Sequence, residues 1–168
     1  EEGLSGRTTV FSDPLFEGLD GLSYISPCLM THEPVDLLII MLGTNDTKER
    51  FSATPQNIAR GLERLTQKAI STTAAWSSRP NILLISPLPI EPGYEHTSVS
   101  GQMGRGCAKK SEALASLYKE IAEQNGCYFL DSSSIKGMHM YPYDYMHLSK
   151  ESHKLLAYNL SKLIPNIC

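Results

Sequence analysis

Residues 35–46 read VDLLIIMLGTND, an apolar run from Val35 to Leu42 with one aspartate inside it, followed at once by a polar turn. Two later stretches have the same character: Asn81 to Ile85 (NILLI) and, more weakly, Cys127 to Leu130 (CYFL). Short, nearly continuous apolar runs bounded by turn residues are typical of strands that are buried on both faces of a parallel sheet. The sequence therefore predicts three such strands.

Amphipathic helices are predicted between and after these strands. Thr54 and Pro55 form a start signal, an N-cap followed by proline at the first helical position, and Asn125-Gly126 forms a stop signal. A last helix begins at Ser149, and a short helix is expected over about residues 21–32, although Pro27 lies inside it. Residues at helical spacing are Ile58, Leu62, Leu65 and Ala69 in the first helix, Leu114, Leu117 and Ile121 in the second, and His153, Leu156, Leu160 and Leu163 in the last.

This alternation of strands and helices predicts an α/β three-layer sandwich with a parallel sheet and right-handed crossovers. The length of 168 residues fits a single domain, residues 1–168. In such sheets ligands bind beyond the carboxyl ends of the strands. Functional residues are therefore expected just after Leu42, Ile85 and Leu130, and after Leu4, where a further strand is expected to end.

The composition excludes several classes of function. Hydrophobic residues make up 41 % of the chain and charged residues 20 %, and the net charge is 15 − 18 = −3. Such a chain is neither disordered nor basic, so nucleic acid is not an expected partner. No apolar run approaches the roughly 20 residues that a membrane span needs.

The cysteines show no metal-binding pattern. There are four, and none forms a CxxC pair or has a histidine at zinc-finger spacing, so no metal is expected. Free thiols and a cytoplasmic location are expected, while two disulfides in a secreted protein remain the alternative. The four are Cys28, Cys107, Cys127 and Cys168.

Three polar turns follow predicted strands. Gly6 allows close approach of the backbone to a substrate, and Asn45 places amide N–H donors just past a buried strand, where they suit an oxyanion. Asp144 stands three residues before His147, close enough to orient the imidazole as a general base. Each turn alone also fits an ordinary Asx turn or a loop ion pair. Their occurrence together favours a catalytic site.

These residues resemble the SGNH or GDSL hydrolase family. Gly6 in LSGRTT matches its second sequence block, Gly43 and Asn45 in LGTND match its third, and Asp144 and His147 in DYMHLS match its fifth. Among its members, the arylesterase and acyltransferase branch is the most similar. The resemblance implies a serine carboxylester hydrolase, with acyl transfer to alcohols as a second activity. It also implies Asp144 and His147 in a Ser-His-Asp triad, Gly6 and Asn45 in an oxyanion hole, a small ester substrate and no cofactor.

One block of the family pattern, the Gly-Asp-Ser-Leu that carries the nucleophile, does not occur in the chain. We expect the first strand and its serine to precede Glu1. Ser5, Ser86 and Ser149 are rejected as substitutes, because turn formation, a strand end and helix capping account for them. One alternative is a non-catalytic fragment or pseudoenzyme that binds small esters or carbohydrates. A flavodoxin-like nucleotide module is another, but no phosphate-binding glycine motif follows a strand.

Two further segments suggest contacts outside the triad. Residues 87–106 hold three prolines and four glycines and are long for a connection, so they are expected either to wall the pocket and contribute to oligomer contacts or to form a mobile solvent loop. Trp76 is expected either to anchor a subunit contact or to join a satellite core. A homo-oligomer is therefore predicted. The remaining histidines are not assigned as the base: His32, His96, His139 and His153.

Overall fold

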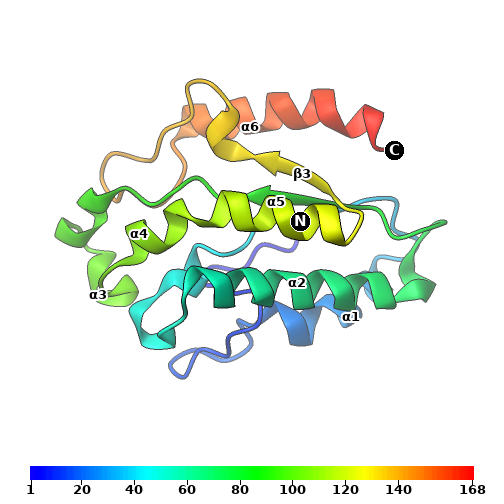
Figure 1. Cartoon of the computed structure of the whole chain (residues 1–168), viewed down its shortest axis with the longest axis horizontal. Coiled ribbons are helices and arrows are strands. Elements are labelled where there is room, and N and C mark those ends of the chain that lie inside the picture. The colour runs from blue at the N-terminus through cyan, green and yellow to red at the C-terminus, as the bar shows by residue number, and fades with distance from the viewer.

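The computed structural model describes residues 1–168 and has a parallel sheet at its centre (Figure 1). Strand β1 (Leu38–Ile40), strand β2 (Ile82–Ser86) and strand β3 (Tyr128–Asp131) lie in the order β1-β2-β3. Leu38 pairs with Ile82, and Leu84 pairs with Phe129. The three predicted strands and their parallel arrangement are confirmed, although only the centre of the run from Val35 to Leu42 pairs as a strand.

The two helix starts and the one helix stop that the sequence signals predicted are found in the structure. The side chain of Thr54 accepts a hydrogen bond from Asn57 N–H, and that of Ser149 accepts one from Ser152 N–H. Both caps satisfy backbone donors that the first turn of a helix leaves free. The α-helices are α1 (Gly21–Thr31), α2 (Pro55–Ser71), α3 (Ser100–Met103), α4 (Cys107–Glu112), α5 (Leu114–Gln124) and α6 (Lys150–Leu163), and the 3₁₀ helices are η1 (Asn45–Thr47), η2 (Glu49–Phe51), η3 (Thr73–Ala75), η4 (Pro92–His96), η5 (Ser132–Ser134) and η6 (Ile164–Asn166).

The helices cover the two faces of the sheet in separate layers. Successive side chains of a strand point to opposite faces. Ile82 and Leu84 pack on the side of α1, α2 and α5, whereas Leu83 and Ile85 pack against α6 and the C-terminal turn. In Figure 1, α6 lies on one side of the sheet, and α1 and α2 lie on the other. The expected three-layer sandwich is confirmed.

Some sequence expectations differ from the structure. Residues 1–4 form no strand. The prediction of a strand that ends at Leu4 is therefore wrong. Trp76 is 7 % exposed and lies in the main core, where its indole N–H donates to Ala69 O at 3.2 Å. It is therefore neither a subunit anchor nor part of a satellite core. His153 is exposed on α6 rather than aligned with its apolar side.

The segment 87–106 folds into η4 and α3 instead of running as a loose loop. Ile90, Tyr94 and Met103 are each at most 2 % exposed and pack with Cys107 in a small apolar cluster of their own. The hydroxyl of Tyr94 donates to Gly104 O at 2.9 Å and accepts from Cys107 N–H at 3.0 Å. This packing argues against the mobile-loop alternative.

The helices also bear on membrane insertion. In none of them does a stretch long enough to cross a bilayer have the necessary apolar character.

Candidate active site

Asp144 and His147 meet in a tight turn between β3 and α6. Asp144 Oδ2 lies 2.9 Å from His147 Nδ1. Asp144 Oδ1 accepts hydrogen bonds from the backbone N–H groups of Met146 and His147, each at 2.9 Å. Tyr145, which follows Asp144 in this turn, has a positive φ of 58°. Because Nδ1 faces the carboxylate, Nε2 is the nitrogen that can exchange a proton with a substrate or a nucleophile.

The charge on Asp144 is favoured by its surroundings. Partial burial on its own would raise the pKa of this carboxyl, but the two backbone N–H bonds and the bond to the imidazole outweigh burial and lower the pKa. The His147 side chain is 66 % exposed, whereas that of Asp144 is 18 % exposed. The Asp144 carboxylate is thus ionised and fixed by backbone hydrogen bonds, and it lies behind an accessible imidazole. The predicted orientation of His147 by Asp144 requires this arrangement.

Asn45 opens η1 directly beyond β1, and its neighbours fix this turn. The hydroxyl of Tyr118 donates to Leu42 O at 3.0 Å. Gly43 has a φ of 125°, and a Cβ at this position would collide with the Tyr118 hydroxyl. Glycine is thus required here both by conformation and by space. Asn45 itself is half-buried.

Asp46 connects the Asn45 turn to the N-terminal segment that carries Gly6. The carboxylate of Asp46 accepts the Thr9 backbone N–H at 3.0 and 3.2 Å and also the Thr9 hydroxyl. Burial raises the pKa of Asp46 to about 6 although the Thr9 hydrogen bonds act in the opposite direction. Gly6, with a φ of 88°, is held three residues before Thr9. The two predicted oxyanion donors therefore belong to turns that are bonded to each other.

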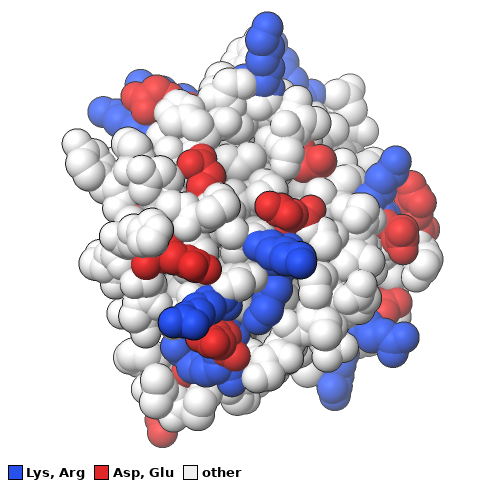
Figure 2. Space-filling model, turned by 60° about the vertical axis from the view of Figure 1, so that its left-hand side comes forward, with Lys and Arg blue, Asp and Glu red and all other residues white.

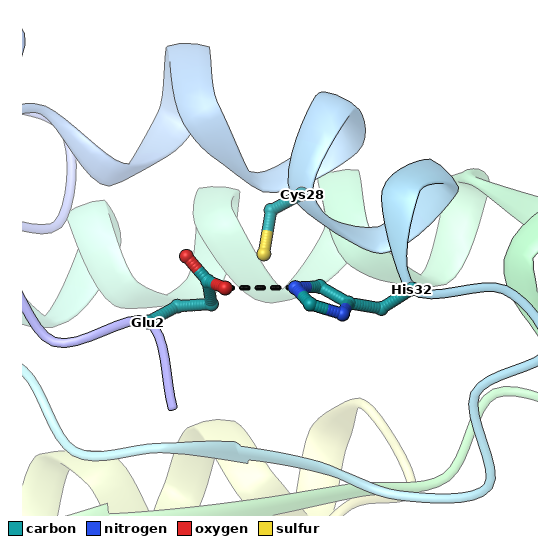
Figure 3. A group of neighbouring side chains, drawn as sticks. All are labelled: Glu2, Cys28 and His32. Carbon is teal, nitrogen blue, oxygen red and sulfur yellow. Dashed lines mark hydrogen bonds and ion pairs between the residues drawn. The ribbon is translucent and has the colours of Figure 1, made fainter.

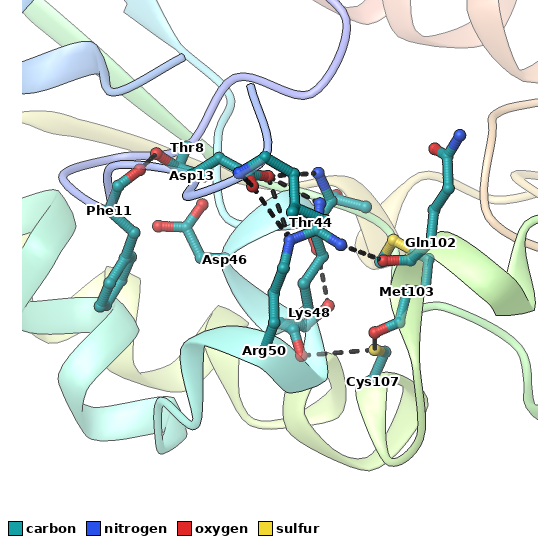
Figure 4. A network of polar contacts seen from close by, with 12 residues as sticks. Thr8, Phe11, Asp13, Thr44, Asp46, Lys48, Arg50, Gln102, Met103 and Cys107 are labelled. Carbon is teal, nitrogen blue, oxygen red and sulfur yellow. Dashed lines mark hydrogen bonds and ion pairs between the residues drawn. The ribbon is translucent and has the colours of Figure 1, made fainter. Parts of the chain in front are cut away.

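Beside these turns lies a charged network that the sequence did not reveal (Figure 4). Asp13 is fully buried and accepts from Arg50 Nη2 at 2.6 Å and Nε at 3.1 Å, while Lys48 Nζ lies 3.6 Å from it. Burial would raise the pKa of Asp13, but the Arg50 hydrogen bonds and the two positive charges lower it. Lys48 Nζ also lies 3.8 Å from where a Cβ on Gly6 would be. A buried cation therefore stands next to the Gly6 turn.

Residues 87–110 join the two halves of the site. Glu91 N–H donates to Tyr145 O at 3.0 Å, beside the Asp144–His147 turn. Cys107 Sγ and Lys110 Nζ both donate to Thr47 O, at 3.3 and 3.0 Å, in the Asn45 turn. In Figure 1 these segments lie together at the left-hand end of the sheet, beyond its strands. The structure thus brings the predicted site residues to one edge, as expected for carboxyl ends of parallel strands.

The serines rejected as nucleophiles have other partners or places. Ser86 Oγ donates to Asp131 Oδ1 at 3.0 Å, and Ser149 caps α6. Ser5 is exposed in the turn that precedes Gly6. Among the other histidines, His139 Nδ1 lies 3.0 Å from Gly137 O, and His32 meets Glu2 on the N-terminal segment. Neither histidine belongs to the Asp144–His147 turn.

A model of the GDSL-like lipase/acylhydrolase family matches residues 1–155. The chain belongs to this family. The match extends over the Gly6, Asn45 and Asp144–His147 turns, and the resemblance inferred from these motifs is confirmed. Together with the esterases described next, it makes the protein a hydrolase of the esterase type.

Solved structures of esterases are similar to the whole chain. An aryl esterase of M. smegmatis is 32 % identical with a TM-score of 0.87, over 100 % of this chain and 78 % of that one. Est24, a carbohydrate acetylesterase from Sinorhizobium meliloti, is 32 % identical with a TM-score of 0.88 over the same shares. A putative arylesterase from Agrobacterium tumefaciens is 30 % identical with a TM-score of 0.82, over 99 % and 78 %. No curated protein sequence matches the chain.

The face that contains these turns has no single charge. Figure 2 brings the left-hand side of Figure 1 forward and shows Lys and Arg interspersed with Asp and Glu among uncharged residues. A polyanion would require a continuous basic surface. The side of the molecule that Figure 2 shows has no such continuous basic surface.

Proposed function

We propose that the protein hydrolyses carboxylic esters through a Ser-His-Asp triad that includes His147 and Asp144. The observation that carries the proposal is the Asp144 carboxylate 2.9 Å from His147 Nδ1, with two backbone N–H groups holding the same carboxylate. This arrangement directs Nε2 outward as a general base. The esterase relatives and the family match support it.

The nucleophile in this proposal is a serine in a segment that precedes Glu1, as the family pattern implies. The serine hydroxyl attacks the ester carbonyl while His147 Nε2 takes its proton. His147 then returns the proton to the leaving alcohol, and Asp144 stabilises the imidazolium. A water molecule, deprotonated by the same nitrogen, hydrolyses the acyl-enzyme and regenerates the serine.

The oxyanion hole in this proposal consists of the Gly6 N–H and the Asn45 side-chain amide, with the N–H of the nucleophilic serine. Each turn has a fixed backbone, because Thr9 and Asp46 bond the two turns together. Fixed donors stabilise a developing negative charge without reorganising. The buried Lys48 ammonium lies beside the Gly6 turn and is paired with Asp13.

We also propose that an alcohol can replace water in the second step. Chemically, the acyl-enzyme reacts with any hydroxyl group that His147 can deprotonate. The resemblance of the motifs to the acyltransferase branch of the family supports this second activity. Measuring ester and free acid products at increasing alcohol concentration tests this activity.

The main experiment uses the full-length protein, 4-nitrophenyl acetate as substrate and diethyl 4-nitrophenyl phosphate as a serine-directed inhibitor. We expect hydrolysis, and one diethylphosphoryl adduct on a serine upstream of Glu1. His147→Ala abolishes both, whereas His153→Gln, a change of an exposed histidine elsewhere, alters neither. An adduct on Ser86, or full activity in folded His147→Ala, would overturn the assignment.

A further inference from the structure

Three metal-ligating side chains, none of them from the Asp144–His147 turn, converge at the end of α1 (Figure 3). Cys28 and His32 are four residues apart and therefore lie on the same side of the helix. Glu2 reaches them from the N-terminal segment, and its Oε1 lies 2.7 Å from His32 Nε2. The Cys28 sulfur, the His32 nitrogen and a Glu2 oxygen all lie within 4.8 Å of one another.

The surroundings of this cluster favour a cation. Tyr24 donates its hydroxyl to the other carboxylate oxygen of Glu2, which orients the carboxylate as the outer partner of a metal ligand does. His32 is also the C-cap of α1, and the last turn of this helix contains no basic residue. The C-terminal end of a helix carries partial negative charge, which no protein cation neutralises within that turn.

We propose that Glu2, Cys28 and His32 bind one Zn²⁺ ion, with water as the fourth ligand. A thiolate, an imidazole and a carboxylate are the donors that zinc takes in tetrahedral sites, and three protein ligands plus water are a common set. His32 and Glu2 side chains are 54 % and 41 % exposed, which leaves room for the water. Cys28 is buried beneath them and supplies the soft sulfur donor.

The geometry requires only small movements. Bonds of about 2.0–2.3 Å to a tetrahedral centre place the donor atoms roughly 3.3–3.8 Å apart. The Glu2–His32 hydrogen bond of 2.7 Å therefore opens by about 0.6–1.1 Å, and the Cys28 sulfur, which lies within 4.8 Å of the other two donors, moves inward by at most about 1.5 Å. Both exposed ligands lie on side chains long enough to adjust.

Charge balances when the thiol loses its proton. Zinc binds cysteine as the thiolate, so the Cys28 thiol must give up its proton when the ion binds. Binding replaces the S–H bond by a Zn–S bond and releases the proton to solvent, and affinity therefore rises with pH. The thiolate and Glu2 together neutralise Zn²⁺, so that Arg7, whose guanidinium stacks 4.3 Å from the Tyr24 ring centre, faces a neutral complex.

The position of the site gives it a consequence for the rest of the molecule. Glu2 lies four residues before Gly6 in the chain, and both belong to the irregular N-terminal segment. A zinc ion would link Glu2 of this segment to both Cys28 and His32, in place of the single Glu2–His32 hydrogen bond. We therefore expect zinc to raise the melting temperature and to restrict the segment that leads to Gly6.

The test titrates the full-length, untagged protein with ZnCl₂ by isothermal titration calorimetry, and with CoCl₂ to detect the thiolate-to-cobalt charge-transfer absorption. Wild type is expected to bind one equivalent of zinc, with proton release and with cobalt–thiolate absorption. Cys28→Ala and His32→Gln are each expected to weaken binding by more than about a hundredfold, and Tyr24→Phe by about tenfold. Cys168→Ser and His153→Gln, exposed residues of the same types elsewhere, serve as matched controls.

Binding that survives Cys28→Ala and His32→Gln at full affinity would overturn the proposal, as would the absence of any binding to wild type. Zinc binding that disappears in His147→Ala, with Cys28→Ala unaffected, would place the ion at the Asp144–His147 pair and also overturn it. Far-ultraviolet circular dichroism of each variant confirms that the fold is intact before titration. Ester hydrolysis is measured separately, so failure of this site does not depend on the proposed catalytic function.

Discussion

Replacing Asp144 by asparagine separates the orientation of His147 from the folding of its turn. In the structure Asp144 Oδ1 accepts two backbone N–H groups, from Met146 and His147, each at 2.9 Å. An asparagine keeps both bonds only if its oxygen occupies the Oδ1 position. Its NH₂ group then takes the place of Oδ2 and points an N–H at His147 Nδ1.

This orientation forces the wrong tautomer on the imidazole. Nδ1 must accept a hydrogen bond from the amide, so the ring proton moves to Nε2, which can no longer take a proton from the nucleophile. A fall in kcat of about 10⁴ is expected for such a change, equivalent to about 5 kcal/mol of transition-state stabilisation at 1.36 kcal/mol per tenfold. KM should change little, since Asp144 lies behind the imidazole rather than against the substrate.

The assay follows hydrolysis of 4-nitrophenyl acetate by the full-length protein, with urea unfolding as the measure of stability. Asp144→Asn should unfold close to wild type because its turn bonds persist, whereas Asp144→Ala should lose both activity and part of the stability. Asp36→Asn, a change of an exposed carboxylate on another surface, is the control. A folded Asp144→Asn protein whose kcat stays within tenfold of wild type would refute the assignment of the triad.

Three other changes test the surroundings of the site. Asn45→Ala should lower kcat by about 10² to 10³ in the same ester assay, with a smaller change in KM, because the amide acts on charge that develops in the transition state. A change in KM alone would contradict this role. Asp13→Asn should lower the free energy of unfolding by about 3–5 kcal/mol in urea titration, because the loss of the Asp13 charge leaves Lys48 buried without its anion. The control Asp36→Asn should lower it by less than about 1 kcal/mol. Equal losses in the two variants would count against a stabilising role of the network. Asp46 has a folded-state pKa of about 6, above its unfolded value, so the folded state binds the extra proton and stability falls as pH rises from about 4 to 6, by up to about 3 kcal/mol. Asp46→Asn should remove this slope in urea titrations across that range, and an unchanged slope would assign it to another group.

Local patterns in the sequence were sufficient for much of the fold. The apolar runs around Leu38–Ile40 and Ile82–Ser86 predicted buried parallel strands, and the caps Thr54 and Ser149 predicted where two helices begin. Each of these signals depends on residues that are neighbours along the chain. The Asp144–His147 pair was predictable for the same reason, since three residues of one turn separate carboxylate and imidazole.

Contacts between distant segments were not predictable in this way. Trp76 was expected at a subunit contact or in a satellite core, yet it packs in the main core, because the side that an isolated aromatic faces depends on the path of the chain around it. Residues 87–106 were expected either to wall the pocket and contribute to oligomer contacts or to form a mobile solvent loop. Their buried cluster with Cys107 exists only when η4, α3 and α4 are folded against one another.

The sequence by itself determined the order of strands and helices, the turns that follow the strands and the pairing of Asp144 with His147, because each of these is set by residues close together along the chain. The tertiary structure decided which charges and ligands meet. Asp13 and Arg50 are 37 positions apart, and Glu2 and His32 are 30 apart. Contacts across such separations require the intervening chain to close a loop, and periodicity carries no information about which residues that closure brings together. The buried Asp13–Lys48–Arg50 network and the Glu2–Cys28–His32 cluster therefore became visible only in three dimensions.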